Sequence, residues 1–155
     1  KAVEKLLPLE FKLEIFENIS SLPHFNPDLD QDSAPEPVLK FRTFISEADG
    51  ILLYTPEYAM GLPGSFKNAI DWTVSSASFS KKPMLSIVAS SQGEMAYQSL
   101  NSILNILEVK PTTQLIPFVR SKINEENEII DEQTLEELAI NVSKFMVDVE
   151  TPTSI

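Results

Sequence analysis

The stretch from Gly50 to Trp72 constrains the fold of this chain more than any other part of its sequence. It opens with an apolar run, Ile51 to Tyr54, that leaves no room for a polar face. Such a run predicts a strand that is buried on both sides. The run stops at Pro56, because proline cannot donate a hydrogen bond within a central ladder.

A loop and a helix follow this predicted strand. Glycine and proline punctuate the loop from residue 56 to residue 64, and Ser65 opens a segment with apolar residues at helical spacing. Strand, loop and helix in that order form half of a βαβ unit. Because ligands of open α/β sheets bind beyond the carboxyl ends of the strands, this loop is the first place to look for function.

The rest of the chain repeats the alternation of strand and helix. We expect further strands at residues 11–16, 84–89 and 113–118, the last at an edge because it contains Pro117. Helices are predicted at the start of the chain, from residue 36 or 37, around residues 96–107, and from residue 131 or 132 onward. The pattern predicts an α/β fold with a doubly wound, mostly parallel sheet in three α/β/α layers.

Length and composition limit the number of domains and the kinds of site and partner that this chain can have. With 155 residues, we expect a single domain over residues 1–150 and a frayed tail at 151–155. The chain has no cysteine, which excludes disulfides, thiolate metal sites and cysteine nucleophiles. A net charge of −11 argues against nucleic acid and anionic membrane surfaces as partners. No apolar run approaches the roughly 20 residues that span a bilayer.

The loop Thr55 to Gly64 has two interpretations. A plain turn would need only glycine and proline, whereas this loop also places Glu57 beside Tyr58 at the end of a strand. A planar, electron-accepting ring requires main-chain N–H groups near its reducible atoms and an aromatic or apolar wall. The loop offers both features, so we favour a ligand site over a simple turn and expect Glu57 to fix the loop.

The segment T-P-E-Y-A-M-G-L-P-G-S-F-K-N-A-I-D-W closely resembles the signature of the NADPH-dependent FMN reductases, which include related azo, quinone and chromate reductases. The resemblance also covers Asn26 to Asp30 and the strand and loop that end at Gly93. It implies a flavodoxin-like fold, FMN bound at the strand ends, and NAD(P)H as the reductant. The electron acceptor would be a flavin, a quinone, an azo compound or a metal oxyanion.

The resemblance also implies roles for individual residues. It places residues of the loop after the strand at Ile51 to Tyr54 along the isoalloxazine and ribityl parts of FMN. Residues of the loop after the strand at residues 84–89 would lie at the pyrimidine end. No side chain is assigned as a catalytic acid or base. These cofactor-binding candidates are Pro56, Glu57, Tyr58, Ala59 and Met60, followed by Ser90, Ser91, Gln92 and Gly93. It further implies a cytoplasmic homodimer or tetramer formed through the helix at residues 65–75, with Asp71 and Trp72 in the subunit contact.

One part of the family pattern has no counterpart in the sequence. The family's first strand and its phosphate loop, rich in Ser, Arg and Asn, do not match any segment here, so we expect them to be missing from the start of the chain. This leaves a second hypothesis open, namely a flavin-free binding or scaffold protein. A phospho-receiver domain is a weaker third alternative, because the strand at Ile51 ends in Thr55-Pro56 rather than in an aspartate.

Overall fold

The computed structural model describes residues 1–30, 34–109 and 111–151. Within them, three parallel strands form one sheet in the order β1-β2-β3. The strands are β1 (Ile51–Thr55), β2 (Met84–Ala89) and β3 (Thr112–Ile116). The helices are α1 (Ala2–Leu6), α2 (Glu36–Glu47), α3 (Gly64–Asp71), α4 (Glu94–Ile106) and α5 (Glu132–Glu150), with short 3-10 helices at Ile19–Ser21, Pro27–Leu29 and Val119–Ser121. Residues 152–155 of the predicted tail lie outside the described residues.

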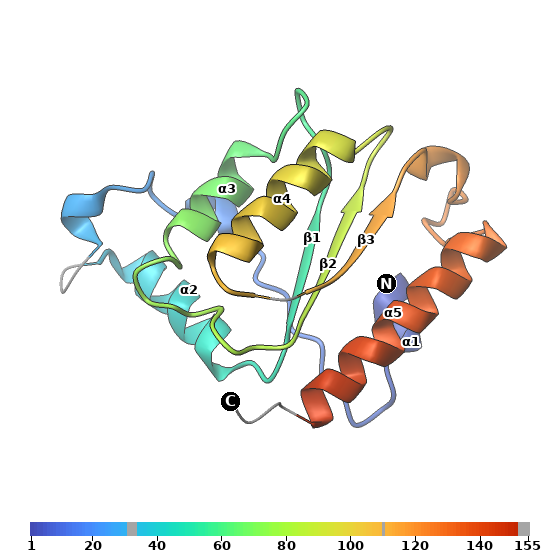
Figure 1. The fold of residues 1–155 in the computed structure, drawn as a ribbon, viewed down its shortest axis with the longest axis horizontal. Helices are drawn as coiled ribbons and strands as arrows, with labels where there is room; N and C mark the ends of the chain where they lie inside the picture. The colour runs from blue at the N-terminus through green and yellow to red at the C-terminus, as the bar shows by residue number, and fades with distance from the viewer. Residues whose placement is uncertain (31–33, 110, 152–155) are drawn as a thin grey trace.

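Helices cover both faces of the sheet, as the alternation predicted. In Figure 1, α2, α3 and α4 lie on one side of the strands, and α1 and α5 lie on the other. The central strand β2 divides its side chains between these two layers. Met84 and Val88 belong to the core under α2, α3 and α4, whereas Leu85, Ile87 and Ala89 belong to the core under α5. The described residues therefore form three layers, α/β/α.

The strand β1 differs from the prediction that it is buried on both sides. Ile51 and Thr55 are buried, but Leu52 and Leu53 are only half-buried and the Tyr54 side chain is 60% exposed. The reason is its position in the sheet. Among the described residues β1 pairs only with β2, so its outer edge and its last residues remain open to solvent.

The predicted strand at residues 11–16 is wrong. These residues alternate apolar and polar side chains, yet they have no regular secondary structure in the structure. An extended segment becomes a strand only when a neighbouring strand satisfies its backbone groups, and none lies beside it in the described chain. Phe16 packs instead on the helix α2, with ring centroids 4.9 Å from Phe41 and 5.3 Å from Phe44.

The remaining elements follow the sequence closely. The predicted edge strand is β3, and the segment after it contains an antiparallel bridge between Ile123 and Ile129. The helix α5 begins after Asp131, whose carboxylate caps it by accepting the Thr134 N–H at 2.9 Å. Within the described residues, no helix is both long enough and apolar enough to cross a membrane.

Candidate functional site

The loops that follow β1, β2 and β3 come together at one edge of the sheet, which is the edge toward which the strand arrows point in Figure 1. The second and third loops are joined by main-chain hydrogen bonds. Ser90 N–H donates to the Ile116 carbonyl at 3.2 Å, and the N–H groups of Phe118 and Val119 donate to the carbonyls of Ser91 and Ser90. The structure thus brings both groups of predicted cofactor-binding residues to the same edge.

The first loop contains a tight two-residue turn. Tyr58 and Gly61 exchange two main-chain hydrogen bonds of 3.0 Å, and the residues between them have positive φ, 49° for Ala59 and 60° for Met60. Positive φ at both central residues is the geometry of a type I′ hairpin turn. Because the Tyr58 N–H is used within the turn, the main-chain donors left at the tip are those of Ala59 and Met60, which make no hydrogen bond within the described residues.

The second loop ends at a glycine that no other residue could replace without strain. Gly93 has φ of +93°, and a Cβ atom there would lie 2.8 Å from Leu115 Cδ1 and 3.4 Å from Val88 Cγ1. This close approach lets α4 begin directly over the ends of β2 and β3. Ser90 is buried beneath the loop, whereas Ser91 and Gln92 are exposed at its surface.

Glu57 connects the two loops. Its Oε2 accepts a hydrogen bond from the Ala96 N–H at 2.9 Å, and its Oε1 accepts a longer one from the Gly93 N–H at 3.4 Å. The carboxylate therefore caps the first turn of α4, where the helix dipole favours negative charge. Since Glu57 occupies this helix end, the α4 N-terminus does not serve as an anion site for a phosphate group.

Exposed apolar side chains surround this edge of the sheet. Tyr58 and Met60 are 65% and 70% exposed in the first loop, Met95 is exposed in the first turn of α4, and Phe118 is 64% exposed after β3. Phe118 also has φ of 55°, an uncommon conformation for a bulky residue. Met95 and Phe118 were not among the site residues predicted from the sequence. The position of Phe118 just beyond a strand could have indicated that it belongs to the site.

The predicted subunit contact at Trp72 is wrong, because its side chain is fully buried within this chain. Its indole N–H donates to the Pro23 carbonyl at 2.8 Å, and its ring meets that of Phe25 edge-on at 5.1 Å. Asn68 adds two hydrogen bonds to the same loop, to the Pro23 carbonyl and from the Phe25 N–H. The end of the signature segment therefore anchors the loop that contains the Asn26 to Asp30 motif.

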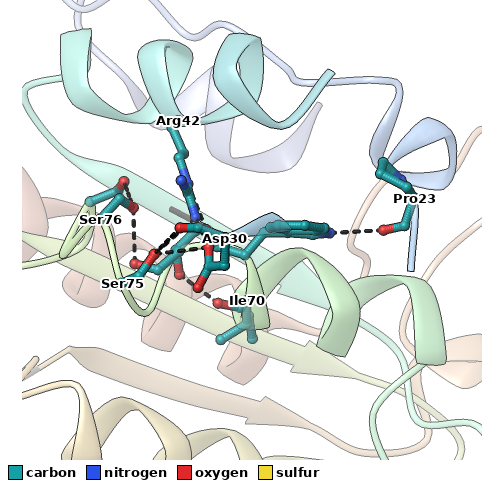
Figure 2. Close-up of polar contacts among 9 residues, drawn as sticks. Pro23, Asp30, Arg42, Ile70, Ser75 and Ser76 are labelled. Carbon is teal, nitrogen blue, oxygen red and sulfur yellow. Dashed lines mark hydrogen bonds and ion pairs between the residues drawn. The ribbon is translucent and has the colours of Figure 1, made fainter. Parts of the chain in front are cut away.

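A second anchor holds the far end of this loop. Figure 2 shows Arg42 of α2 and Asp30 pointing toward one another in an ion pair, next to Ser75. Both charged side chains are nearly buried, at 14% and 11% exposure. Arg42 also donates to the Trp72 carbonyl at 2.7 Å, and Ser75 Oγ donates to the Asp30 carboxylate at 2.9 Å. The loop is thus fixed at both ends against α2 and α3.

Two shallow hollows lie elsewhere on the described surface. One, of about 270 Å³, lies between β3 and α5 and is lined by Gln114 and Asn141 among others; the second, of about 360 Å³, runs along α2. In the first, Gln114 Oε1 accepts a hydrogen bond from Asn141, while its buried Nε2 has no partner among the described residues. Neither hollow includes the residues of the two loops.

Comparison with known proteins identifies the class to which this fold and edge belong. The pattern of the NADPH-dependent FMN reductases matches residues 1–120. A 2-hydroxy-1,4-benzoquinone reductase from a Burkholderia species is 30% identical over 154 residues, covering 93% of this chain and 82% of that protein. A quinone reductase from Escherichia coli K12 is 28% identical over 156 residues, with 94% and 82% covered.

A solved structure agrees with these relatives. FerB, a flavoenzyme NAD(P)H:(acceptor) oxidoreductase from Paracoccus denitrificans, superposes with a TM-score of 0.74 at 28% identity, covering 97% of this chain and 87% of that chain. An NADH:FMN oxidoreductase at 16% identity and a TM-score of 0.56 shares the fold.

The chain belongs to the NADPH-dependent FMN reductase family, and the predicted flavodoxin-like fold is confirmed. Family membership makes it an oxidoreductase that uses FMN, with NAD(P)H as reductant.

Proposed function

We propose that this chain is an FMN-dependent NAD(P)H oxidoreductase whose electron acceptor is a quinone, and that the flavin ring lies on the loops after β1 and β2. The main support is the turn at Tyr58 to Gly61, which leaves two main-chain donors at its tip, in a loop that Glu57 joins to Gly93. Donors held by a rigid backbone suit a ring that gains electron density on reduction.

The residues of this edge fit the ring of FMN. The N–H groups of Ala59 and Met60 would face its acceptor atoms, and the exposed Tyr58 ring would supply an aromatic wall. Ser91 and Gln92, both exposed at the end of the second loop, would reach the pyrimidine end. Pro56 and Ser90 would shape the floor, the latter because it is buried under the loop.

When bound, FMN supplies the redox chemistry, in which two electrons and a proton leave NAD(P)H and two electrons and two protons reach the quinone. This chain's residues hold and orient the reactants. The only histidine of the sequence, His24, lies in the loop anchored by Trp72 and not in the loops after β1 and β2. We therefore assign no side-chain acid or base, and the second proton comes from solvent.

A quinone suits the apolar surroundings of this edge. The exposed side chains of Tyr58, Met60, Met95 and Phe118 offer a surface on which a flat, apolar acceptor can lie. Relatives named as reductases of 2-hydroxy-1,4-benzoquinone and of quinones support the same class of acceptor, and one named as an NADPH azoreductase makes azo compounds the next candidates.

We also propose that two copies associate through residues 65–75. Trp72 is buried and cannot take part, but Ser65 and Val74 are exposed, and Val74 is an apolar side chain with 53% exposure. Light scattering should show a dimer or tetramer that Val74→Asp converts to a smaller species. A monomeric wild-type protein would contradict this part of the proposal. The cytoplasmic location stays a prediction.

The function can be tested with the full-length protein. We expect visible absorbance to show FMN bound at micromolar concentration, and benzoquinone to accelerate NAD(P)H consumption. Tyr58→Ala should weaken FMN binding about tenfold, since an aromatic wall contributes roughly 1–3 kcal/mol of stacking. Ile106→Ala is the control, because it removes an exposed apolar side chain at the opposite end of α4. A colourless protein that leaves NAD(P)H unoxidised would refute the proposal and favour a flavin-free scaffold.

A further inference from the structure

We propose that Glu57 is a positioning residue that holds the two loops of the site at a fixed spacing, so that both can engage one flavin ring. The inference rests on the proposed function, because it concerns the geometry that flavin binding requires. It assigns Glu57 a role through the main chain of other residues rather than a contact with the reacting atoms.

The position of Glu57 makes it a short link between distant parts of the chain. It follows Pro56 directly at the end of β1 and precedes Tyr58, the first residue of the closed turn. Its carboxylate reaches Gly93 and Ala96, which are 36 and 39 residues away in sequence. A single side chain therefore joins the main chain of the second loop to the first loop.

Other hydrogen bonds do not replace this link. The turn closes on itself through Tyr58 and Gly61, and the second loop is joined to the end of β3 through Ser90 and Ser91. Within the described chain, the bonds of Glu57 are the ones that join residues 56–63 to residues 90–97. Without them, no hydrogen bond among the described residues joins the loop that carries Ala59 and Met60 to the second loop.

The chemistry of the link predicts graded effects of substitution. Glu57→Ala removes both acceptors. Glu57→Gln keeps one acceptor, which can bond the Ala96 N–H, but its NH₂ group cannot accept from Gly93. We therefore expect Glu57→Gln to fall between the wild type and Glu57→Ala. A flavin that must contact both loops will sense this loss of preorganisation as a loss of affinity.

A matched control exists in the same chain. Asp131 caps α5 as Glu57 caps α4, and its carboxylate accepts from the Thr134 N–H and hydroxyl at 2.9 and 2.5 Å. Asp131→Ala thus also removes a carboxylate cap, but one that bonds neither loop. Both alanine variants should lower the melting temperature by a few degrees through the lost cap. Any larger effect of Glu57→Ala on flavin binding then reports positioning rather than stability.

The test measures the FMN dissociation constant and amide hydrogen exchange in the full-length protein. Glu57→Ala should raise the dissociation constant about tenfold or more, Glu57→Gln by less, and Asp131→Ala by less than twofold. Without flavin, Glu57→Ala should speed exchange both at the start of α4 and at the hydrogen-bonded amides of Tyr58 and Gly61, whereas Asp131→Ala should speed it only at the start of α5.

Two results would overturn the inference. One is equal weakening of FMN binding by Glu57→Ala and Asp131→Ala. The other is faster exchange confined to the start of α4, which would make Glu57 a cap and nothing more. If the wild-type protein binds no FMN, the proposed function fails by itself, and hydrogen exchange at Tyr58 and Gly61 still decides whether Glu57 couples the loops.

Discussion

The nearly buried ion pair between Arg42 and Asp30 gives the sharpest prediction about stability. Asp30→Ala leaves the Arg42 guanidinium nearly buried, with the Trp72 carbonyl and Ser75 hydroxyl as its remaining acceptors. Removing one partner of a fully buried pair costs about 3–5 kcal/mol. Because the two side chains keep 14% and 11% exposure, we expect a smaller loss of unfolding free energy, about 2–4 kcal/mol.

Thermal and urea unfolding measure this loss. For a chain of this length the predicted change lowers the melting temperature by about 5–15 °C. The double variant Asp30→Leu with Arg42→Met should recover part of the loss, since no buried charge remains, but not all of it, since the Trp72 carbonyl loses a donor. Lys40→Ala, which breaks an exposed pair on the same helix, should change stability little. A loss below about 0.5 kcal/mol for Asp30→Ala would refute the reasoning.

Three further predictions concern other parts of the chain. Gly50→Ala should lower the free energy of unfolding by about 1–3 kcal/mol, because its Cβ would lie 2.8 Å from Phe145. Gly64→Ala is the control and should be neutral or slightly stabilising, because a Cβ there would have nothing within 4 Å. Equal melting temperatures of the two variants would contradict this prediction. Gln114→Met removes a buried donor without a partner but also the oxygen that accepts from Asn141, so the free energy of unfolding in urea should rise by less than about 1 kcal/mol, and a decrease would count against it. Hydrogen bonds from Thr134 lower the pKa of Asp131 below its ordinary value of 3.8, so its contribution is complete at neutral pH and is lost as pH falls through the lowered pKa. The difference in melting temperature between wild type and Asp131→Ala should therefore be constant from about pH 7 to 5 and shrink in stronger acid; a difference that grows on acidification would contradict it.

Periodicity predicted the elements whose partners lie in the described chain. The run from Met84 to Ala89 is a fully buried strand, because it has a strand on each side and helices on both faces. The same reasoning failed for residues 11–16 and for Tyr54, where the local pattern is that of a strand or a buried position but the neighbour that would pair with it is absent from the described residues. A pattern of side chains predicts that a segment favours the strand conformation, and pairing with a neighbouring strand decides whether it forms one.

The site was predicted in outline but not in its internal connections. The sequence placed the two loops at one edge, because parallel strands share their carboxyl ends. It could not show that Glu57 spans to Ala96, that Trp72 is buried against Pro23, or that Phe118 is exposed beside Ser91. Each of these depends on contacts between residues far apart in sequence, which local spacing does not encode.

The position of the flavin ring is the most direct test of the proposed function. A crystal structure of the full-length protein with FMN would measure this. We predict the ring against the turn of Ala59 and Met60, with its pyrimidine end at Ser91 to Gly93. A ring bound elsewhere, for example in the hollow beside Gln114, or a turn that points away from the bound flavin, would contradict the account.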